Sequence, residues 1–170
     1  DSRRIVYEAR DGQEIEGYLS LPAGSSGENL PLILFPHGGP MSSDRGGFDY
    51  WTQFFTSRGY AVLQPNFRGS SDYGYDFSMA SLQQWGLAMQ DDLEDGVRWL
   101  AEEGIVNPRR VCIVGASYGG YAALMGVVKT PDTYRCAVSF AGISSLPDFR
   151  SFSRNYVNKK VVNEQLGSDK

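Results

Sequence analysis

Short, almost wholly apolar runs recur along this chain, and longer segments with helical spacing of apolar residues separate them. Such runs are typical of strands that are buried on both faces of a sheet. In residues 88–103, Met89, Leu93 and Val97 fall on one stripe, as in an amphipathic helix. We therefore predict strands at 32–36, 60–65, 111–114 and 135–141, and helices at 48–57, 75–84, 88–103 and 118–128.

The first residues alternate between apolar and polar side chains, which indicates a hairpin over residues 4–21 with Asp11-Gly12 at its turn. A Gly/Ser-rich loop leads from this hairpin to a core that we expect over residues 31–142. The alternation of strands and helices predicts an α/β fold, with a mostly parallel sheet and helices on both faces. Ligands bind such sheets beyond the carboxyl ends of the strands.

The pattern loosens after Gly142. We expect a short helix within residues 145–160 and no closing element in residues 161–170. Residues 143–170 are therefore interpreted as an incomplete C-terminal region, and residues 1–170 as a partial domain whose sheet stops one strand after the helix at 118–128. The first turn of the 88–103 helix is rich in acids, which we interpret as a solvated face.

The strongest chemical signal is Gly115-Ala116-Ser117-Tyr118-Gly119, placed between an apolar strand and an Ala/Leu/Met-rich helix. This is a Gly-x-Ser-x-Gly pattern, in which a sharp strand-to-helix turn lifts the serine clear of the sheet. The helix N-terminus favours negative charge beside that serine. Ser117 is therefore the predicted nucleophile.

A serine nucleophile needs backbone donors for the oxyanion that forms on its substrate. The residue after the nucleophile supplies one of them, so we assign the Tyr118 N–H. The other comes from a Gly-rich loop after an earlier strand. His37-Gly38-Gly39-Pro40 follows the strand at 32–36, and we assign Gly39, with Gly38 as the alternative.

The general base is missing from this pattern. His37 is the only histidine, and it precedes Ser117, whereas in this fold the order is serine, acid, histidine. We therefore predict that His37 holds its loop by hydrogen bonds. Either the chain has no triad, or it is the N-terminal part of a catalytic domain, which the short sheet favours. The acids that follow Ser117 are Asp132, Asp148, Glu164 and Asp169.

Composition narrows the possible partners. A net charge of −4 argues against nucleic acid and anionic membranes, and no run is long enough to span a bilayer. No secretory signal is visible, so we expect a cytoplasmic protein. Cys112 and Cys136 are expected to be buried free thiols. With one histidine and no Cys-x-x-Cys, we expect no metal site, and no motif calls for a cofactor.

Several motifs together resemble the catalytic domain of the prolyl oligopeptidase family of serine peptidases, especially its acylaminoacyl-peptidase branch. The matching pieces cover most of the chain: Pro36 to Pro40, Asn66 to Ser70 with Tyr73-Gly74, Trp85-Gly86 ahead of Asp92, Pro108 to Val111, and Gly115 to Tyr121. Ser71-Asp72 departs slightly from the small residues usual in that loop.

The resemblance implies an α/β-hydrolase fold and a peptidase for short peptides, with a β-propeller in front. It implies Ser117 as nucleophile, Tyr118 and Gly39 as oxyanion donors, and an acid and a histidine after later strands. It also suggests an apolar pocket for the residue before the scissile bond. That pocket would be lined by Ile143, Phe149, Phe152 and Tyr156, although a local packing cluster explains these residues as well.

Two other functions remain open. Serine chemistry does not separate amides from esters, so a carboxylesterase-type hydrolase fits the same motifs. A non-catalytic binding domain with a hydrolase fold fits the missing histidine. In either case a partial sheet would expose an edge strand, so we expect association with a second copy or with a missing C-terminal catalytic segment.

Overall fold

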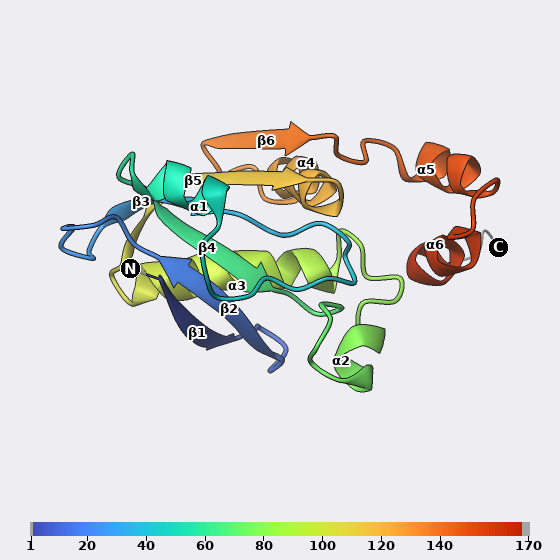
Figure 1. The fold of residues 1–170 in the computed structure, drawn as a ribbon, viewed down its shortest axis with the longest axis horizontal. Coiled ribbons are helices and arrows are strands. Elements are labelled where there is room, and N and C mark those ends of the chain that lie inside the picture. The colour runs from blue at the N-terminus through green and yellow to red at the C-terminus, as the bar shows by residue number, and fades with distance from the viewer. Residues whose placement is uncertain (1, 168–170) are drawn as a thin grey trace.

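The computed structural model describes residues 2–167, in which a six-stranded sheet has the order β1-β2-β4-β3-β5-β6 (Figure 1). The first strand is antiparallel to the second, and the second to the fourth, whereas β3 is parallel to both β4 and β5, and β5 to β6. The mostly parallel sheet is therefore as predicted. The strands are β1 (Ser2–Glu8), β2 (Glu14–Ser20), β3 (Leu30–Leu34), β4 (Ala61–Asn66), β5 (Val106–Ala116) and β6 (Cys136–Phe140).

Helices cover both faces of this sheet. On β4, Leu63 faces α3, whereas the next residue, Gln64, accepts a hydrogen bond from Thr52 of α1. Successive side chains of a strand point to opposite faces, so α1 and α3 lie on opposite sides. None of the helices within residues 2–167 is long and apolar enough to cross a bilayer. They are α1 (Tyr50–Thr56), α2 (Tyr75–Met79), α3 (Ala88–Glu102), α4 (Tyr118–Lys129), α5 (Leu146–Ser153) and α6 (Lys159–Leu166).

The main core lies between the sheet and the pair α3 and α4. Leu32 and Leu34 of β3 are fully buried, as are Met89 and Leu93 on the predicted stripe of α3. Each such side chain contributes about 1.5–3 kcal/mol when it leaves water. The last three residues of β3 and all residues of β4 are buried, as the mostly apolar runs at 32–36 and 60–65 predict.

Three predicted elements need correction. The strand predicted at 111–114 is longer: β5 already begins at Val106 and includes Asn107-Pro108, where the register against β3 shifts and residues between Val106 and Val111 leave the ladder. A proline lacks the N–H for a ladder hydrogen bond, so it is tolerated at such an irregularity. The strand β6 is at the edge rather than buried, and its Phe140 is 74% exposed. A helix, α6, occupies residues that were expected to hold no element; residues 168–170 lie outside the described part.

The two cysteines form a disulfide instead of remaining free thiols. Cys112 of β5 and Cys136 of β6 are direct partners in the parallel register, with their Cα atoms 4.7 Å apart. That separation lies within the range that a disulfide can bridge. The prediction of free thiols failed because the sequence does not show that these two strands pair in this register.

Candidate active site

Ser117 occupies the sharp turn that the sequence predicts. It connects β5 to α4 with φ 55° and ψ −119°, a conformation that is costly for a residue with a side chain. Its N–H donates to the carbonyl of Phe140 at 3.1 Å, and its own carbonyl accepts from the Tyr121 N–H at 3.0 Å. The residue is exposed, so its hydroxyl is accessible from solvent.

The glycines around Ser117 are required by close backbone contacts. A Cβ on Gly115 would lie 2.3 Å from the Gly119 carbonyl oxygen, and a Cβ on Gly119 would lie 2.2 Å from the Pro36 carbonyl oxygen. Neither contact can be relieved by a side-chain movement, because both involve backbone atoms. The second contact also places the start of α4 directly against the segment that follows β3.

The loop that carries the predicted second donor lies beside the nucleophile. A Cβ on Gly38 would lie 3.4 Å from Ser117 Cβ and 4.0 Å from Ser117 Oγ. Gly39 is exposed, and its φ of 127° is accessible mainly to glycine. Among residues 2–167, the Gly39 N–H donates to no protein acceptor, and Tyr118 begins α4, where N–H groups have no intrahelical partner. Two backbone donors are thus positioned near one serine, an arrangement suited to an oxyanion.

His37 has the structural role that chain order predicts. Its Nδ1 lies 2.7 Å from the Gly38 carbonyl oxygen, and its Nε2 lies 2.9 Å from Ser70 Oγ. Within the described residues these are the partners of the ring nitrogens, and Ser117 is not among them. Burial lowers the pKa of His37, because the protonated ring loses its hydration.

Much of the acidic face of α3 is buried, contrary to the interpretation of the sequence. Asp92 and Asp95 are fully buried beneath the turn of the β1–β2 hairpin, and two arginines reach them from outside the helix. Arg68, which follows β4, pairs with both Asp92 and Asp11. Burial raises the pKa of Asp92, whereas the guanidinium of Arg68 lowers the pKa of Asp11 to about 2.

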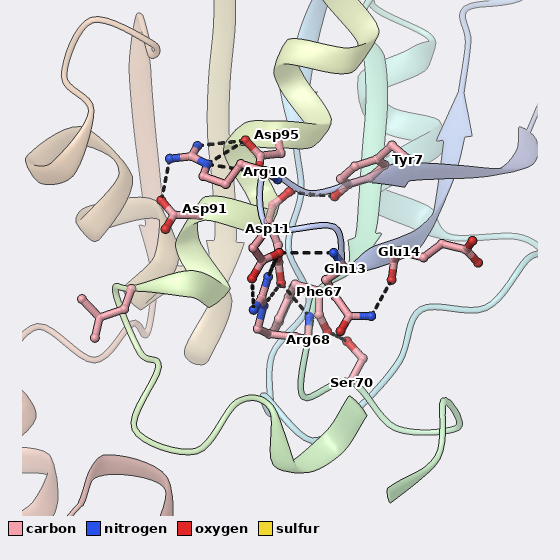
Figure 2. Close-up of polar contacts among 12 residues, drawn as sticks. Tyr7, Arg10, Asp11, Gln13, Glu14, Phe67, Arg68, Ser70, Asp91 and Asp95 are labelled. Carbon is pink, nitrogen blue, oxygen red and sulfur yellow. Dashed lines mark hydrogen bonds and ion pairs between the residues drawn. The ribbon is translucent and has the colours of Figure 1, made fainter. Parts of the chain in front are cut away.

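Figure 2 shows how these contacts bind separate elements together. Arg10 extends from the hairpin to Asp95 and Asp91, while Arg68 meets Asp11 near the hairpin turn. The Tyr7 hydroxyl donates to the Asp92 carbonyl at 2.9 Å. These residues connect the hairpin, α3 and the loop after β4, although none of them touches Ser117.

Residues that sequence reasoning missed are therefore Arg68, Asp92 and Ser70. The first and the last belong to the Asn66-Phe67-Arg68-Gly69-Ser70 segment, which, like Asp92, was singled out only for its resemblance to the family. A helical wheel places Asp92 at the border of the apolar stripe, which was the available signal for its burial.

The predicted apolar pocket residues lie around α5. Ile143, Phe149 and Phe152 line a hollow of about 320 Å³. Phe149 and Phe152 also border a hollow of about 340 Å³ together with Tyr156. A third hollow, of about 160 Å³, has Phe149 and Gly39 in its walls. Phe149 is thus the side chain that joins the predicted pocket to the oxyanion loop, and whether substrate enters there stays a prediction.

The acids that follow Ser117 have different surroundings. Asp148 lies in the first turn of α5 and borders the hollow with Ile143. Asp132 and Glu164 are exposed, and Asp169 lies outside the described residues. None of these placements brings an acid to a histidine within residues 2–167, because His37 is held by Gly38 and Ser70.

Comparisons with known proteins identify the family of the chain. The sequence profile of the prolyl oligopeptidase family matches residues 47–167. Dipeptidyl aminopeptidase BIII of Pseudoxanthomonas mexicana is 41% identical over 149 residues, which are 84% of this chain and 22% of that protein. The chain therefore spans less than a quarter of the length of this relative.

Solved structures show the same fold. The structure of a puromycin hydrolase superposes with a TM-score of 0.91 and 28% identity, covering 99% of this chain and 26% of that one. The acylaminoacyl peptidase of Pyrococcus horikoshii superposes with a TM-score of 0.88 and 29% identity, covering 99% and 27%. Residues 2–167 thus form part of an α/β-hydrolase domain, and the chain belongs to the prolyl oligopeptidase family.

Proposed function

We propose that the full-length protein is a serine peptidase that hydrolyses short peptides through an acyl-enzyme on Ser117. The observation that carries this proposal is the strained turn at Ser117, set at the N-terminus of α4 and beside Gly38. Membership of the prolyl oligopeptidase family supports it.

In this mechanism Ser117 Oγ attacks the carbonyl carbon of the scissile bond, and negative charge develops on the carbonyl oxygen. The N–H groups of Tyr118 and Gly39 would donate to that oxygen and stabilise it. The base that takes the proton from Ser117, and the acid that orients the base, would come from parts of the protein outside these 170 residues. Collapse of the tetrahedral intermediate releases the amine, which takes this proton from the base. The base then takes a proton from water, the hydroxide hydrolyses the ester, and the proton returns to Ser117 Oγ.

An apolar pocket for the residue before the scissile bond is a further part of the proposal. Phe152 is 64% exposed and Tyr156 is 54% exposed, so both offer apolar surface to a ligand beside α5. Phe149 is partly buried and lies between this surface and Gly39. The arrangement favours a peptide with an apolar side chain at that position.

We also propose that further strands pair with β6 in the whole protein. Support comes from the exposure of its apolar side chains, with Val138 at 51% and Phe140 at 74%, and from the greater length of the relatives. A β-propeller in front of the domain and a cytoplasmic location remain proposals as well. In the isolated chain the same edge would pair with a second copy, which light scattering can detect.

The proposal is tested by labelling the full-length protein with a fluorophosphonate probe and by mass spectrometry of the labelled peptide. We expect the label on Ser117, its loss in Ser117→Ala, and no effect of Ser57→Ala, an exposed serine at the end of α1. A protein whose Ser117 never labels would instead be a non-catalytic binding domain. Turnover of a p-nitrophenyl ester without cleavage of any peptide anilide would indicate a carboxylesterase.

A further inference from the structure

The ring of His37 lies between the oxyanion loop and the loop that follows β4. It stacks on Phe67, with ring centroids 4.5 Å apart and an interplanar angle of 19°. Its two nitrogens hold Gly38 of its own loop and Ser70 of the other loop. The ring is therefore fixed in three directions, although it does not bind the nucleophile.

The hydrogen bonds determine which nitrogen carries the proton. The Gly38 carbonyl oxygen can only accept, so the bond of 2.7 Å requires a proton on Nδ1. In the neutral ring Nε2 then accepts, and the Ser70 hydroxyl must donate to it. The same hydroxyl also lies 2.7 Å from the Phe67 carbonyl oxygen, and its single proton can be donated to only one of these two acceptors at a time. The Phe67 carbonyl in addition accepts the backbone N–H of Ser70 at 3.0 Å, so it keeps a donor when the hydroxyl donates to Nε2.

This bond to Gly38 acts on Gly39 through the peptide that the two glycines share. A peptide unit is planar and trans, so its C=O and N–H point in opposite directions. Because Nδ1–H holds the Gly38 carbonyl, it also sets the direction of the Gly39 N–H. That N–H has no acceptor within residues 2–167, and the adjoining Gly38 lies against Ser117. We infer that His37 is a positioning residue, which orients the Gly39 N–H as an oxyanion donor.

The other end of the ring is anchored to α3. Ser70 is fully buried, and it lies two residues after Arg68, whose backbone N–H and guanidinium both bind Asp92. Asp92 belongs to a long helix of the core, so it gives the loop a rigid support. A series of contacts therefore leads from α3 to the oxyanion donor. Asp92 holds Arg68, the loop of Arg68 carries Ser70, Ser70 holds His37, and His37 holds the peptide between Gly38 and Gly39.

Phe67 contacts both His37 and Tyr118, the residue that carries the second proposed oxyanion donor. It stacks on His37, and it also packs against Tyr118 with ring centroids 5.3 Å apart. Tyr118 carries the other proposed oxyanion N–H and is completely buried. One aromatic side chain thus contacts both the positioning residue of the first donor and the residue that carries the second donor.

The inference rests on the proposed serine-peptidase activity, and three variants of the full-length protein test it. His37→Phe keeps a ring for stacking on Phe67 but removes both nitrogens. His37→Asn places an N–H donor near the position of Nδ1, whereas His37→Gln places one near Nε2. Donation to the Gly38 carbonyl is therefore restored by the first amide and not by the second.

We expect His37→Phe to lower kcat about 10- to 100-fold on a peptide anilide with KM changed less than about threefold, because a misdirected donor acts on the transition state. His37→Asn should recover most of the loss, and His37→Gln should not. Leu93→Ala, in the buried core of α3, is the control for lost stability, and its kcat per folded molecule should remain that of the wild type.

Two results would overturn the inference while leaving the proposed function intact. The first is a wild-type kcat in His37→Phe. The second is a recovery of kcat in His37→Gln but not in His37→Asn. Both results count only if Ser117 of the wild-type protein reacts with the fluorophosphonate. If His37→Phe does not fold, the comparison of the two amides decides alone. A wild-type protein that neither labels nor cleaves would refute the proposed function first, and this inference with it.

Discussion

Arg68 binds Asp92 with its backbone and its side chain at once: the backbone N–H and Nε each lie 2.9 Å from Asp92 Oδ2, and Nη2 lies 2.7 Å from Oδ1. Both side chains are withdrawn from solvent, with exposed fractions of 9% for arginine and 0% for aspartate. A pair of this kind holds a defined geometry because each charge compensates the other in a region of low dielectric constant.

Removal of one partner should be strongly destabilising. In Asp92→Ala the guanidinium of Arg68 loses its buried counter-charge, and we expect a loss of about 3–5 kcal/mol in the free energy of unfolding. Glu102→Ala is the control on the same helix, since that exposed carboxylate makes only a distant contact with Arg98, at 3.8 Å. Denaturant unfolding measures both. Equal losses of unfolding free energy in the two variants would show that burial does not make the Arg68–Asp92 pair more important for stability than the exposed Arg98–Glu102 pair.

The pocket hypothesis predicts different effects for two neighbouring phenylalanines. Phe152 is 64% exposed, so Phe152→Ala should raise KM about tenfold for a peptide with an apolar residue before the scissile bond while leaving Tm nearly unchanged. Phe149 also stacks on Trp85, with centroids 6.2 Å apart, so Phe149→Ala should raise KM and lower Tm together. Steady-state kinetics with apolar and small residues at that position provide the measurement. An unchanged KM in both variants would leave these rings as a packing cluster.

Asp44 predicts a dependence of stability on pH. Its Oδ2 is buried without a hydrogen-bond partner among residues 2–167, and burial, aided by the charge of Asp49, raises its pKa to about 7. The unfolded value is about 4, so the folded state retains a proton that the unfolded state has lost between these two values. Stability from this group is therefore complete below about pH 4, falls as the pH rises to about 7, and is constant above that.

Asp44→Asn mimics the protonated acid and should remove this fall. We expect the variant to match the wild type near pH 4, to exceed its Tm increasingly as the pH rises to about 7, and to keep a constant difference above that. Asp72→Asn serves as a control in which the pH dependence has the opposite sign. Ser43 and Arg45 lower the pKa of that exposed acid, so its ionised form stabilises the folded state. Scanning calorimetry at unit steps of pH tests both. A Tm difference for Asp44→Asn that is constant with pH would contradict the expected titration.

The disulfide and the expected cytoplasmic location predict different thiol states. Glutathione and thioredoxin keep cytosolic thiols reduced, whereas disulfides persist in oxidising compartments. From the Cys112–Cys136 bond we expect no reaction with an alkylating reagent until a reductant is added, as seen by intact mass. Cys136→Ser, which leaves one thiol, is the control for reagent access. Two reactive thiols in protein taken directly from cells would favour the reduced form and the cytoplasm.

Local sequence was sufficient to predict the strands that are buried on both faces of the sheet. The apolar runs that became β3 and β4 need no knowledge of their neighbours, and the glycines around Ser117 mark a turn whose crowding is local. The same holds for the stripe on α3, since Leu93 and Val97 face the sheet whatever covers the other side. These features account for the fold class and for Ser117 at its turn.

The remaining features depend on contacts between distant residues. Asp95 lies on the polar side of α3, and only the hairpin that supplies Arg10, 85 positions earlier in the chain, makes that side an interior. The pairing of Cys112 with Cys136 depends likewise on the register between two strands. Helical wheels and composition contain neither kind of information.

The hydrogen bond between His37 and Ser70 couples the motions of the segments that follow β3 and β4. It is one of several bonds that join two segments about 30 residues apart, so neither segment can open without breaking contacts with the other. Segments coupled in this way exchange their amide hydrogens as one cooperative unit. Slowing of exchange in one segment by a ligand should therefore extend to the other. The joining pairs include His37 with Ser70, Ser42 with Ser71, Asp44 with Asn66, and Ser43 and Arg45 with Asp72.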